Sequence, residues 1–514
     1  MEFPILLSTV NARYSHSSMG LRCIFANLSE LQDKTKIIEH TIKESPESIV
    51  ESWLSHNPKI IGLGIYIWNI EVMEKSITLL KATRPEVAII VGGPEVSYGI
   101  SKALDKHIDY IVQLEGEDAF KSLCHDILKG RFPKQRVIKA RVLDTLTLKM
   151  PYKYYTEEDI KNRKIYVEAS RGCAFKCQFC LSSLDAGIRN YNIDLFLDEM
   201  KKLYNRGVRQ FKFIDRTFNL NIKISTKILN FFIELDPNQD FFLHFEVVPD
   251  RLPSDLKHYI EMFKPGVLQF EVGIQTLDKK VSDRIGRRQN KNKALENLSY
   301  LRHKTNAHLH VDLIIGLPGA SIDIFKNDLN ELVAIGLQEV QVGILKLLKG
   351  TPIHQHIIPF EMKFDSTPPY EIISNKHIDE EQMKELRAFH KFFDKFYNSG
   401  NFQESMKLLF ELSNPFDEFF ALSNFTFNRF ERCYGISLDQ LCESLYLFLT
   451  IKRNISHVNA REMILKDILK KKGRKIPVFL KDYELGVPHV HQKKSPDSLA
   501  VSYTHLRAHE TDSY

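Results

Sequence analysis

Residues 167–180 read Val167-Glu168-Ala169-Ser170-Arg171-Gly172-Cys173-Ala174-Phe175-Lys176-Cys177-Gln178-Phe179-Cys180. Three cysteines fall within eight residues, directly after a strand-like run at 164–169, and no fourth cysteine follows at ligand spacing. Because so short a loop brings its sulfurs to one side, C-x-x-x-C-x-x-C suits one face of an iron-sulfur cube. A structural zinc site needs four protein ligands, so three ligands leave one metal position open to a molecule that is not protein. An odd number of cysteines also disfavours a disulfide.

With the aromatic Phe179 just before the last cysteine, this stretch resembles the cluster loop of radical S-adenosylmethionine (SAM) enzymes. In that family the open iron is chelated by the amino and carboxylate groups of SAM, and an electron from the cluster cleaves SAM to a 5'-deoxyadenosyl radical. The resemblance implies a 4Fe-4S cluster on Cys173, Cys177 and Cys180, with Phe179 next to SAM. A cluster that serves redox chemistry alone is the alternative.

Length and composition are those of a multidomain globular protein. The 514 residues are 43% hydrophobic and 26% charged, and the chain is too long for one ordinary domain. A net charge of +6 is spread over the whole length, which is not the footprint of a nucleic-acid-binding protein. The N-terminus has no basic segment and its apolar run ends at Val10. We therefore expect neither a signal peptide nor a transmembrane helix, and a cytoplasmic protein.

Residues 1–130 alternate between apolar strands and amphipathic helices. Repeated strand–helix units of this length predict a doubly wound, Rossmann-like α/β domain, whose ligands bind at the carboxyl ends of parallel strands. No G-x-G-x-x-G follows the first strand, which disfavours a nicotinamide-type dinucleotide. The predicted strands are 4–10, 36–41, 59–66, 87–91 and 110–113, and the predicted helices are 18–31, 48–56 and 71–83.

Unusual residues collect after these strands, where glycine lets backbone amides approach a bulky ligand and aromatic rings offer a flat apolar surface. In front of a radical SAM loop, this arrangement resembles the cobalamin-binding domain that precedes many radical SAM enzymes. The Gly-Gly-Pro-Glu and Glu-Gly-Glu segments carry most of this resemblance. The implied cobalamin-binding residues are Asn11, His16, Tyr66, Trp68, Asn69, Gly92, Gly93, Pro94, Glu95, Glu115, Gly116 and Glu117.

One motif departs from the cobalamin mutases. The D-x-H-x-x-G sequence that supplies their histidine to cobalt is absent from the expected loop, although His16 lies there. Many radical SAM relatives leave the lower cobalt face without a histidine, and we interpret His16 as a solvated loop residue rather than a cobalt ligand. The alternative for this domain is a flavodoxin-like fold that has lost its cofactor or binds another one.

Residues 131–163 carry turn and charge signals and are predicted to connect two domains. From residue 164 to about 360 the strand–helix alternation resumes with six repeats. Six repeats predict the open, partial (β/α)6 barrel of radical SAM enzymes, with function at the carboxyl ends of its strands. The predicted strands are 164–169, 210–214, 242–247, 266–272, 309–315 and 339–345, and the helices are 194–204, 222–232, 255–263, 291–303 and 322–335.

The resemblance to radical SAM enzymes also implies SAM contacts at the ends of these strands. The segment after the second strand would reach the SAM amino group, the fourth strand the ribose and methionine, and the last two strands the adenine and ribose. Glu271 stands out, because a carboxylate among apolar strands is costly unless it is paired or ligand-bound. Besides Phe179, the implied contacts are Asp215, Arg216, Thr217, Glu271, Gln275, Asp312 and Gly350.

From residue 379 the chain shows apolar positions at helical spacing and dense phenylalanine, which predicts helices at 380–398, 401–413 and 438–454 and a helical C-terminal domain assigned to residues 361–490. The three-part arrangement resembles a bacterial group of radical SAM proteins with such an extension. Residues 491–514 are predicted to form a disordered tail. Its last part, 501–514, resembles one reading frame through a common sequencing adapter, so we expect the natural C-terminus to be missing.

These features predict an oxygen-sensitive, cobalamin-dependent radical SAM enzyme, with methyl transfer to an unactivated carbon as the leading reaction. A cobalamin-assisted radical rearrangement or cyclisation is the alternative, and a non-catalytic cobalamin or redox sensor is a third hypothesis. The resemblance implies an electron donor of the flavodoxin or ferredoxin type. The substrate is open between a small molecule and a peptide, because the barrel loops and the helical extension carry no readable code for it.

Overall fold

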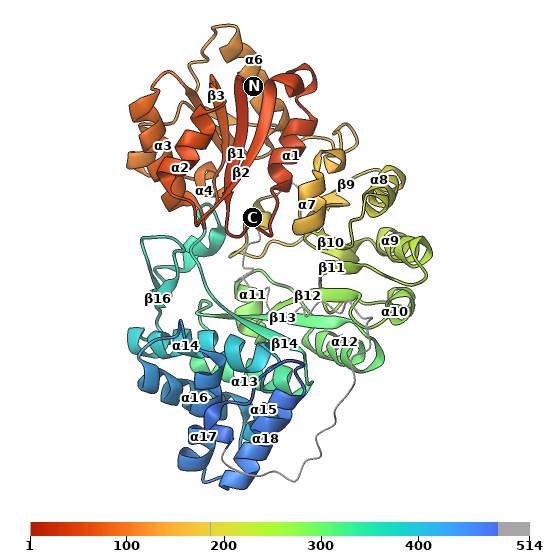
Figure 1. The fold of residues 1–514 in the computed structure, drawn as a ribbon, viewed down its shortest axis with the longest axis vertical. Helices are drawn as coiled ribbons and strands as arrows, with labels where there is room; N and C mark the ends of the chain where they lie inside the picture. Colours follow the sequence, from red (N-terminus) through yellow and green to blue (C-terminus); the bar gives the residue numbers. More distant parts are fainter. Residues whose placement is uncertain (1, 186, 482–514) are drawn as a thin grey trace.

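In the computed structural model (Figure 1), which describes residues 2–185 and 187–481, the first six strands form one parallel sheet. Its order is β2-β1-β3-β4-β5-β6, so the winding reverses between β1 and β3. Helices cover both faces of this first domain, which confirms the predicted doubly wound fold. The predicted tail at 491–514 lies outside the described residues. The strands are β1 (Ile5–Asn11), β2 (Thr35–Thr41), β3 (Ile60–Gly64), β4 (Ala88–Gly92), β5 (Tyr110–Gln113) and β6 (Val137–Lys139). The helices are α1 (Met19–Ala26), α2 (Pro46–Leu54), α3 (Ile70–Thr83), α4 (Pro94–Ser97), α5 (Lys102–Asp105) and α6 (Gly116–Leu128).

Two separate hydrophobic clusters pack on opposite faces of this sheet, because neighbouring side chains of a strand point to opposite sides. Leu6 joins the cluster of α2 and α3, whereas Leu7 joins that of α1 and α6. The sheet is apolar on both faces, as expected for a parallel sheet between two helix layers. The fully buried Trp53 of α2 still satisfies its indole N–H, which donates to Ser8 Oγ at 2.9 Å.

Residues 131–163, which the sequence predicts as a connector, contain a strand, a 3-10 turn (Tyr152–Tyr154) and an α-helix. Strand β6 pairs in parallel with β5 and extends the first sheet. Helix α7 (Glu157–Asn162) begins at a capping box of Thr156 and Asp159. Asp159 also accepts a hydrogen bond from Arg22 Nη2 at 2.8 Å, which ties α7 to the first domain.

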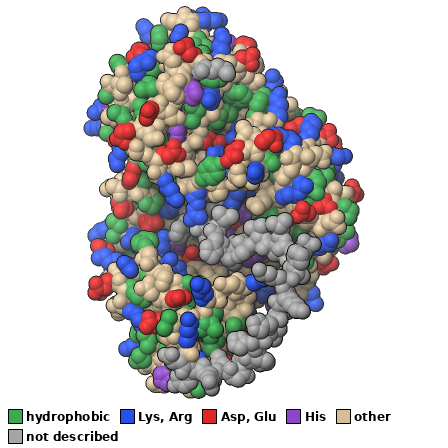
Figure 2. Space-filling model, in the orientation of Figure 1, with side chains coloured by type: hydrophobic (Ala, Val, Ile, Leu, Met, Phe, Trp, Pro, Cys, Tyr) green, Lys and Arg blue, Asp and Glu red, His purple; other side chains and the backbone are tan. Residues whose placement is uncertain are grey.

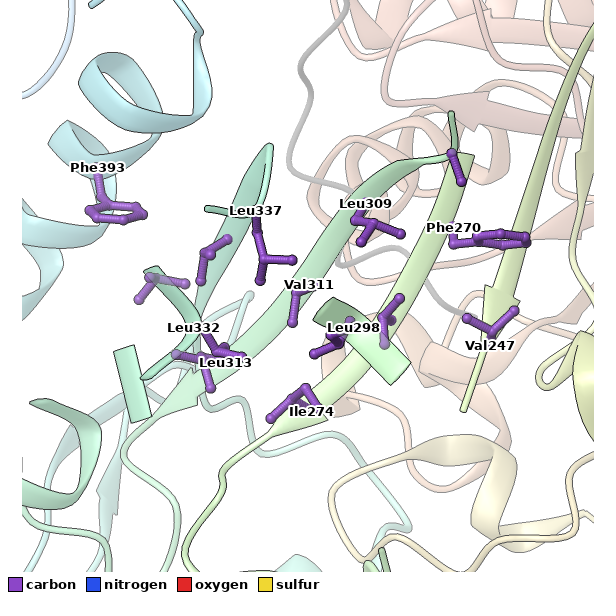
Figure 3. Close-up of a cluster of buried hydrophobic side chains, with 14 of the residues drawn as sticks. Val247, Phe270, Ile274, Leu298, Leu309, Val311, Leu313, Leu332, Leu337 and Phe393 are labelled. Carbon is purple, nitrogen blue, oxygen red and sulfur yellow. The ribbon is translucent and has the colours of Figure 1, made fainter. Parts of the chain in front are cut away.

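A second parallel sheet of six strands follows, in the order β7-β10-β11-β12-β13-β14, and confirms the predicted partial barrel. Buried and half-buried residues alternate along β12 and β13, so one face of each strand packs on helices and the other lines the barrel interior. Figure 3 shows Leu309, Val311 and Leu313 of β13 beside Leu298 and Leu332 of the covering helices. The strands are β7 (Ile165–Val167), β10 (Gln210–Phe213), β11 (Phe242–Val247), β12 (Leu268–Gln275), β13 (His308–Ile315) and β14 (Glu339–Ile344). The helices are α8 (Ile193–Asn205), α9 (Ile222–Leu235), α10 (Ser254–Glu261), α11 (Lys279–Arg284), α12 (Lys291–Lys304) and α13 (Ile322–Ala334).

The C-terminal part is helical, as predicted, and shares one continuous hydrophobic cluster with the barrel. A short π-helical turn, Asp394–Asn398, follows α14 and brings Asn398 to the edge strand β14. There the Asn398 side chain accepts from Val340 N–H at 2.9 Å and donates to Val340 O at 3.0 Å, which satisfies the open edge of the sheet. The helices are α14 (Glu380–Phe393), α15 (Gln403–Phe410), α16 (Pro415–Phe430), α17 (Leu438–Leu447) and α18 (His457–Leu469), preceded by a small ribbon of β15 (Lys363–Phe364) and β16 (Ile372–Ser374).

Basic and acidic side chains are interspersed over the face seen in Figure 2, in line with the spread of charge along the sequence. Within residues 2–185 and 187–481, no helix combines the length and the apolar character that crossing a membrane requires.

Candidate active site at the domain junction

The cluster loop leaves β7 and forms one strand of a small ribbon, β8 (Ser170–Arg171), before the cysteines; β9 (Arg189–Asn190) is its other strand. Asp215, which follows β10, accepts hydrogen bonds from Ala169 N–H at 3.0 Å and from the Ser170 hydroxyl at 2.6 Å. Burial raises the pKa of Asp215 to about 6, although these donors oppose the rise. Both oxygens of this predicted SAM contact are thus engaged in holding the cluster loop to β10.

Cys173 and Cys177 are buried in this loop and Cys180 is half-buried. Burial raises the pKa of Cys173 and of Cys177, and the neighbouring cysteines raise both further. Phe175 N–H donates to Cys173 Sγ at 3.4 Å, and Arg287 Nη1 donates to Cys177 Sγ at 3.6 Å. Two of the sulfurs therefore already face N–H groups that stabilise a thiolate.

The donor set fits an iron-sulfur cluster better than a single metal ion. In the described part of the chain, no three His, Cys, Asp or Glu side chains are arranged to hold one ion. A four-iron cube does not require such convergence, because each thiolate binds a different iron and the sulfurs stay apart. Buried thiols with nearby N–H groups are the surroundings that such a cluster uses. The assignment of Cys173, Cys177 and Cys180 as cluster ligands stays a prediction.

Two glycines let other backbone segments close around the loop. Gly172 has φ +88°, and a Cβ there would lie 2.0 Å from Gly187 O. Gly286 has φ +71°, and its Cβ would lie 2.6 Å from Lys176 O. The loop backbone is also bonded on both sides of Gln178, whose N–H donates to Ile285 O and whose carbonyl accepts from Ile353 N–H, each at 2.8 Å. A side chain at either glycine would push these segments apart.

We expect Gly172→Ala to lower the iron content of the purified protein and to destabilise the loop by about 1–3 kcal/mol, because alanine is strained at this φ and meets Gly187 O. Iron and sulfide per chain would measure the effect. Gly130→Ala is the matched control, since Gly130 has φ +72° in a turn where a Cβ meets nothing within 4 Å. Equal losses of iron in both variants would contradict a specific role for the close approach.

Charged side chains line the barrel interior. Glu271 accepts a hydrogen bond from His244, with Nε2 and Oε2 3.2 Å apart. Burial alone would raise the pKa of Glu271, but His244 and Lys212 outweigh this effect and lower the pKa. Glu246 lies opposite Glu271 in the β11–β12 register, and burial beside Glu271 raises the pKa of Glu246 to about 7 despite Arg216. Glu271 is therefore the ionised member of this carboxylate pair.

Asp312 of β13 has one carboxylate oxygen, Oδ1, that is buried without a hydrogen-bond partner among the described residues. Burial and the neighbouring Glu271 raise its pKa well above the usual range. A buried oxygen without a partner is costly, so it fits a site that a ligand donor completes. This observation supports the predicted SAM contact at Asp312.

A cavity of about 840 Å³, a volume that includes open solvent at its mouth, lies between the first domain and the barrel. Tyr66 and Trp68 stack in its wall with ring centroids 4.4 Å apart and an interplanar angle of 5°. Residues predicted for cobalamin and residues predicted for SAM thus meet at one cavity, at the β1/β3 switch point where doubly wound sheets bind ligands. The lining residues are Asn11, Ala12, His16, Ser17, Ser18, Met19, Gly20, Tyr66 and Trp68 from the first domain, and Tyr166, Lys212, Ile214, Arg216, Glu246 and Glu271 from the barrel.

Asn69, predicted to contact cobalamin, has its side chain engaged by backbone groups. Its Nδ2 donates to Val10 O at 3.0 Å and to Gly64 O at 3.1 Å, and its Oδ1 accepts from Tyr66 N–H at 2.8 Å. In this structure Asn69 joins the ends of β1 and β3 and fixes the position of Tyr66. His16, by contrast, lines the cavity and its Nδ1 hydrogen-bonds the hydroxyl of Tyr166 on β7.

The segment after β4 reaches the end of the barrel. Gly93 has φ +104° and precedes Pro94, the first residue of α4. Glu95 is buried and forms an ion pair with Lys349 Nζ at 2.6 Å. A Cβ at Gly350 would lie 2.3 Å from the ring of Tyr98, so Gly350, a predicted SAM contact, packs against the first domain.

The Glu-Gly-Glu segment lies against the cluster loop rather than in the cavity wall. Glu117 forms an ion pair with Arg171 Nη1 at 2.7 Å, and Glu115 accepts from Arg189 Nη1 at 3.1 Å. Gly116 begins α6 between them. These arginine partners were not among the predicted site residues, although Arg171 stands inside the loop that carries the cysteines.

Three further predicted SAM contacts lie on the barrel side. Phe179 is partly buried against the large hydrophobic cluster, and the Thr217 hydroxyl donates to Arg216 O at 2.6 Å and neighbours Cys173. Gln275 has φ +68° at the end of β12, and its side-chain nitrogen lies near Gly273. Lys212, His244 and Glu246 were not predicted; their polar character at alternate positions of apolar strands is the signal that could have found them.

Three family models match the chain: "B12 binding domain" at residues 6–124, "Radical SAM superfamily" at 167–332, and "Protein of unknown function (DUF4080)" at 359–506. The cobalamin-dependent radical SAM methyltransferase TokK of Streptomyces tokunonensis is 24% identical over 354 residues, which cover 61% of this chain and 50% of TokK. The 2-(S-pantetheinyl)-carbapenam-3-carboxylate methyltransferase of Streptantibioticus cattleyicolor is 23% identical over 345 residues, which cover 58% and 48%. The chain spans about half the length of these two relatives.

Solved structures share the fold. OxsB, a cobalamin-dependent SAM radical enzyme with aqua-cobalamin and SAM bound, superposes with a TM-score of 0.62 at 13% identity, covering 91% of this chain and 79% of OxsB. The radical SAM methyltransferase TsrM from Kitasatospora setae, with cobalamin and a 4Fe-4S cluster bound, gives 0.58 at 14% identity, covering 72% and 82%. The two family models thus match the first domain and the barrel in the predicted order, so the chain carries a B12-binding domain followed by a radical SAM domain.

Proposed function

We propose that this protein is a cobalamin-dependent radical SAM enzyme that transfers a methyl group to an unactivated carbon. The observation that carries the proposal is the cavity between the two domains. The loops after β1 and β3 of the first domain form one wall, and charged side chains of the barrel interior form the other. A corrinoid on the first domain and SAM in the barrel would face each other across this space. The methyltransferase names of the curated relatives support the choice of reaction.

The cofactors proposed are a 4Fe-4S cluster on Cys173, Cys177 and Cys180, SAM in the barrel, and cobalamin against the loops after β1 and β3. When bound, the cluster would supply one electron to cleave SAM into methionine and a 5'-deoxyadenosyl radical, which would take a hydrogen atom from the substrate carbon, and the corrinoid would supply the methyl group that replaces it. Ionised Glu271 and the unsatisfied Asp312 Oδ1 are acceptors suited to the ammonium and hydroxyl groups of SAM.

The remaining groups position the reactants and exclude water. Tyr66 and Trp68 offer stacked rings to a flat corrin, and burial raises the pKa of Tyr66 to about 12, so its hydroxyl stays neutral and can donate. Arg216, Lys212 and Glu246 line the cavity, so side chains of both charges border the space that a polar substrate would occupy. A reducing compartment such as the cytoplasm, and an electron donor of the flavodoxin or ferredoxin type, are part of the proposal and agree with seven free cysteines.

The test loads the full chain with iron, sulfide and hydroxocobalamin without oxygen, and adds a reductant and SAM labelled in its methyl group. Absorbance follows the corrinoid, and mass spectrometry follows 5'-deoxyadenosine and methyl-labelled products from a cell extract. Retained corrinoid, deoxyadenosine and a labelled product would support methyl transfer. Deoxyadenosine with a product of unchanged mass would favour rearrangement or cyclisation instead. A cluster without corrinoid would remove the cobalamin half of the proposal, and intact cofactors without deoxyadenosine would indicate a sensor.

A further inference from the structure

The first turn of α6, in the first domain, contacts the cluster loop through a buried ion-pair network. Arg171 stands two residues before Cys173 and lies at the centre of this network. Its Nη1 is 2.7 Å from Glu117 Oε1, and its Nε donates to Glu168 Oε1 at 2.8 Å. Glu115 is the outer member, with its Oε2 3.8 Å from Arg171 Nη1.

Each of the two carboxylates that bind Arg171 is held in place by other parts of the fold. The Tyr191 hydroxyl donates to Glu168 Oε1 at 2.6 Å, and the backbone of Glu168 is bonded to the Tyr152 hydroxyl through both its N–H and its carbonyl. Glu117 lies in the first turn of α6, whose apolar face is buried on the first sheet. The guanidinium therefore joins two parts of the fold that have their own anchors.

A second contact runs parallel to the first. Arg189 of β9, the strand that pairs with Ser170 and Arg171, binds Glu115 and donates to Leu143 O at 2.5 Å. Both strands of the ribbon thus bind the first domain, and β9 also binds the segment that follows β6. The cluster loop is held from the barrel side by Asp215 and from the first-domain side by Glu115 and Glu117.

Burial makes this network sensitive to the loss of one member. The side chains of Arg171, Glu117 and Glu168 are only 13%, 4% and 9% exposed. Removing the Glu117 charge leaves Arg171 paired with Glu168 of its own segment, while its remaining first-domain carboxylate, Glu115, lies 3.8 Å away, so the buried guanidinium is no longer closely bound to α6. Because Arg171 is two residues from Cys173, its displacement carries the first cysteine with it.

We propose that Glu117, supported by Glu115, is a positioning residue for the cluster loop, so that the first domain sets the geometry in which the cysteines bind iron. The chemistry of the cluster itself rests on the proposed function. The positioning of the loop does not, because it is a property of the chain before any cofactor is bound.

The test compares full-length wild type, Glu117→Gln and Glu117→Asp with Glu418→Gln. Glu418 is the matched control, because it also is a buried glutamate paired with an arginine, Arg453 at 2.6 Å, but it lies on α16, outside the predicted cofactor sites. In cluster-free protein we expect Glu117→Gln to speed amide hydrogen exchange of residues 170–180 roughly tenfold. After reconstitution it should bind less iron and give an altered electron paramagnetic resonance spectrum, whereas Glu117→Asp restores part of both and Glu418→Gln resembles wild type.

If Glu117→Gln does not fold, the triple variant Glu117→Gln/Glu168→Gln/Arg171→Gln removes the charges of all three members and leaves none of them unpaired. It should fold and still show fast exchange in the loop. Wild-type exchange and spectra in Glu117→Gln, or the same changes in Glu418→Gln, would overturn the proposal and leave an ordinary domain contact. A wild-type chain that binds no iron would sink the proposed function instead, while the exchange measurement would still report on the loop.

Discussion

Protein in which Cys173, Cys177 and Cys180 are all replaced by alanine is expected to bind no iron-sulfur cluster and to form no 5'-deoxyadenosine. The three thiols are the only ligands proposed for the cluster, and each would hold a separate iron. Their replacement leaves Phe175 N–H and Arg287 facing alanine, so the loop keeps its backbone contacts while it loses its donors. Iron and sulfide analysis, absorbance and mass spectrometry measure the loss.

The control replaces three cysteines outside the loop, Cys124, Cys433 and Cys442. It removes as many thiols and should keep its cluster, since these residues lie on or after helices of the first and third parts of the chain. If the variant without Cys173, Cys177 and Cys180 binds as much iron as this control, the assignment of these three residues as cluster ligands is contradicted. A triple variant that binds no iron and still retains corrinoid would show that the two cofactor sites load independently.

Replacing Glu271 by alanine is expected to weaken SAM binding by about 10–100-fold, because a carboxylate that accepts charge-assisted hydrogen bonds contributes about 1.5–3 kcal/mol. Glu271 is the ionised carboxylate of the cavity, kept so by His244 and Lys212. Equilibrium dialysis of SAM against anaerobic, cluster-loaded protein gives the dissociation constant directly. Glu271→Gln should lose less, because it keeps the acceptor oxygen and loses the charge.

Glu339→Ala is the matched control for this prediction. Glu339 is also paired with a histidine on the neighbouring strand, His308 at 2.9 Å, but it stands at the start of β14 and does not line the cavity. We expect its SAM affinity to equal that of wild type. Wild-type affinity in Glu271→Ala would mean that Glu271 serves only to orient His244.

The sequence was most informative where the signal is local. The cysteine spacing, the strand–helix alternation and the Phe-rich helices each appear within a short window, and they predicted eleven of the twelve strands of the two large sheets and the helical extension. Strand β6 was missed because its three residues, Val137–Lys139, show no run of buried apolar positions. The predicted helix at 18–31 ends at Ala26, and a separate 3-10 turn follows from Ser29, whose φ is +52°.

Pairings across long stretches of chain could not be predicted in the same way. Glu117 and Asn69 both follow strands, where a polar side chain can face a ligand or turn back to the protein. Only the fold shows that Glu117 meets Arg171 and that Asn69 bonds to the end of β1. The polar interior of the barrel was only partly predicted for the same reason, since the role of His244 depends on its pairing with Glu271 on the next strand.

One continuous hydrophobic cluster joins the barrel to the helices after residue 380, and it limits where recombination can divide the gene. A barrel cut off before α14 would expose the apolar surface that the later helices cover, including Phe325 of α13, whose ring packs against Phe389 and Phe416, and would be prone to aggregate. The first domain, by contrast, contains two separate hydrophobic clusters. Exchange between genes can therefore transplant the first domain as a module, whereas the barrel and its extension have to be inherited together.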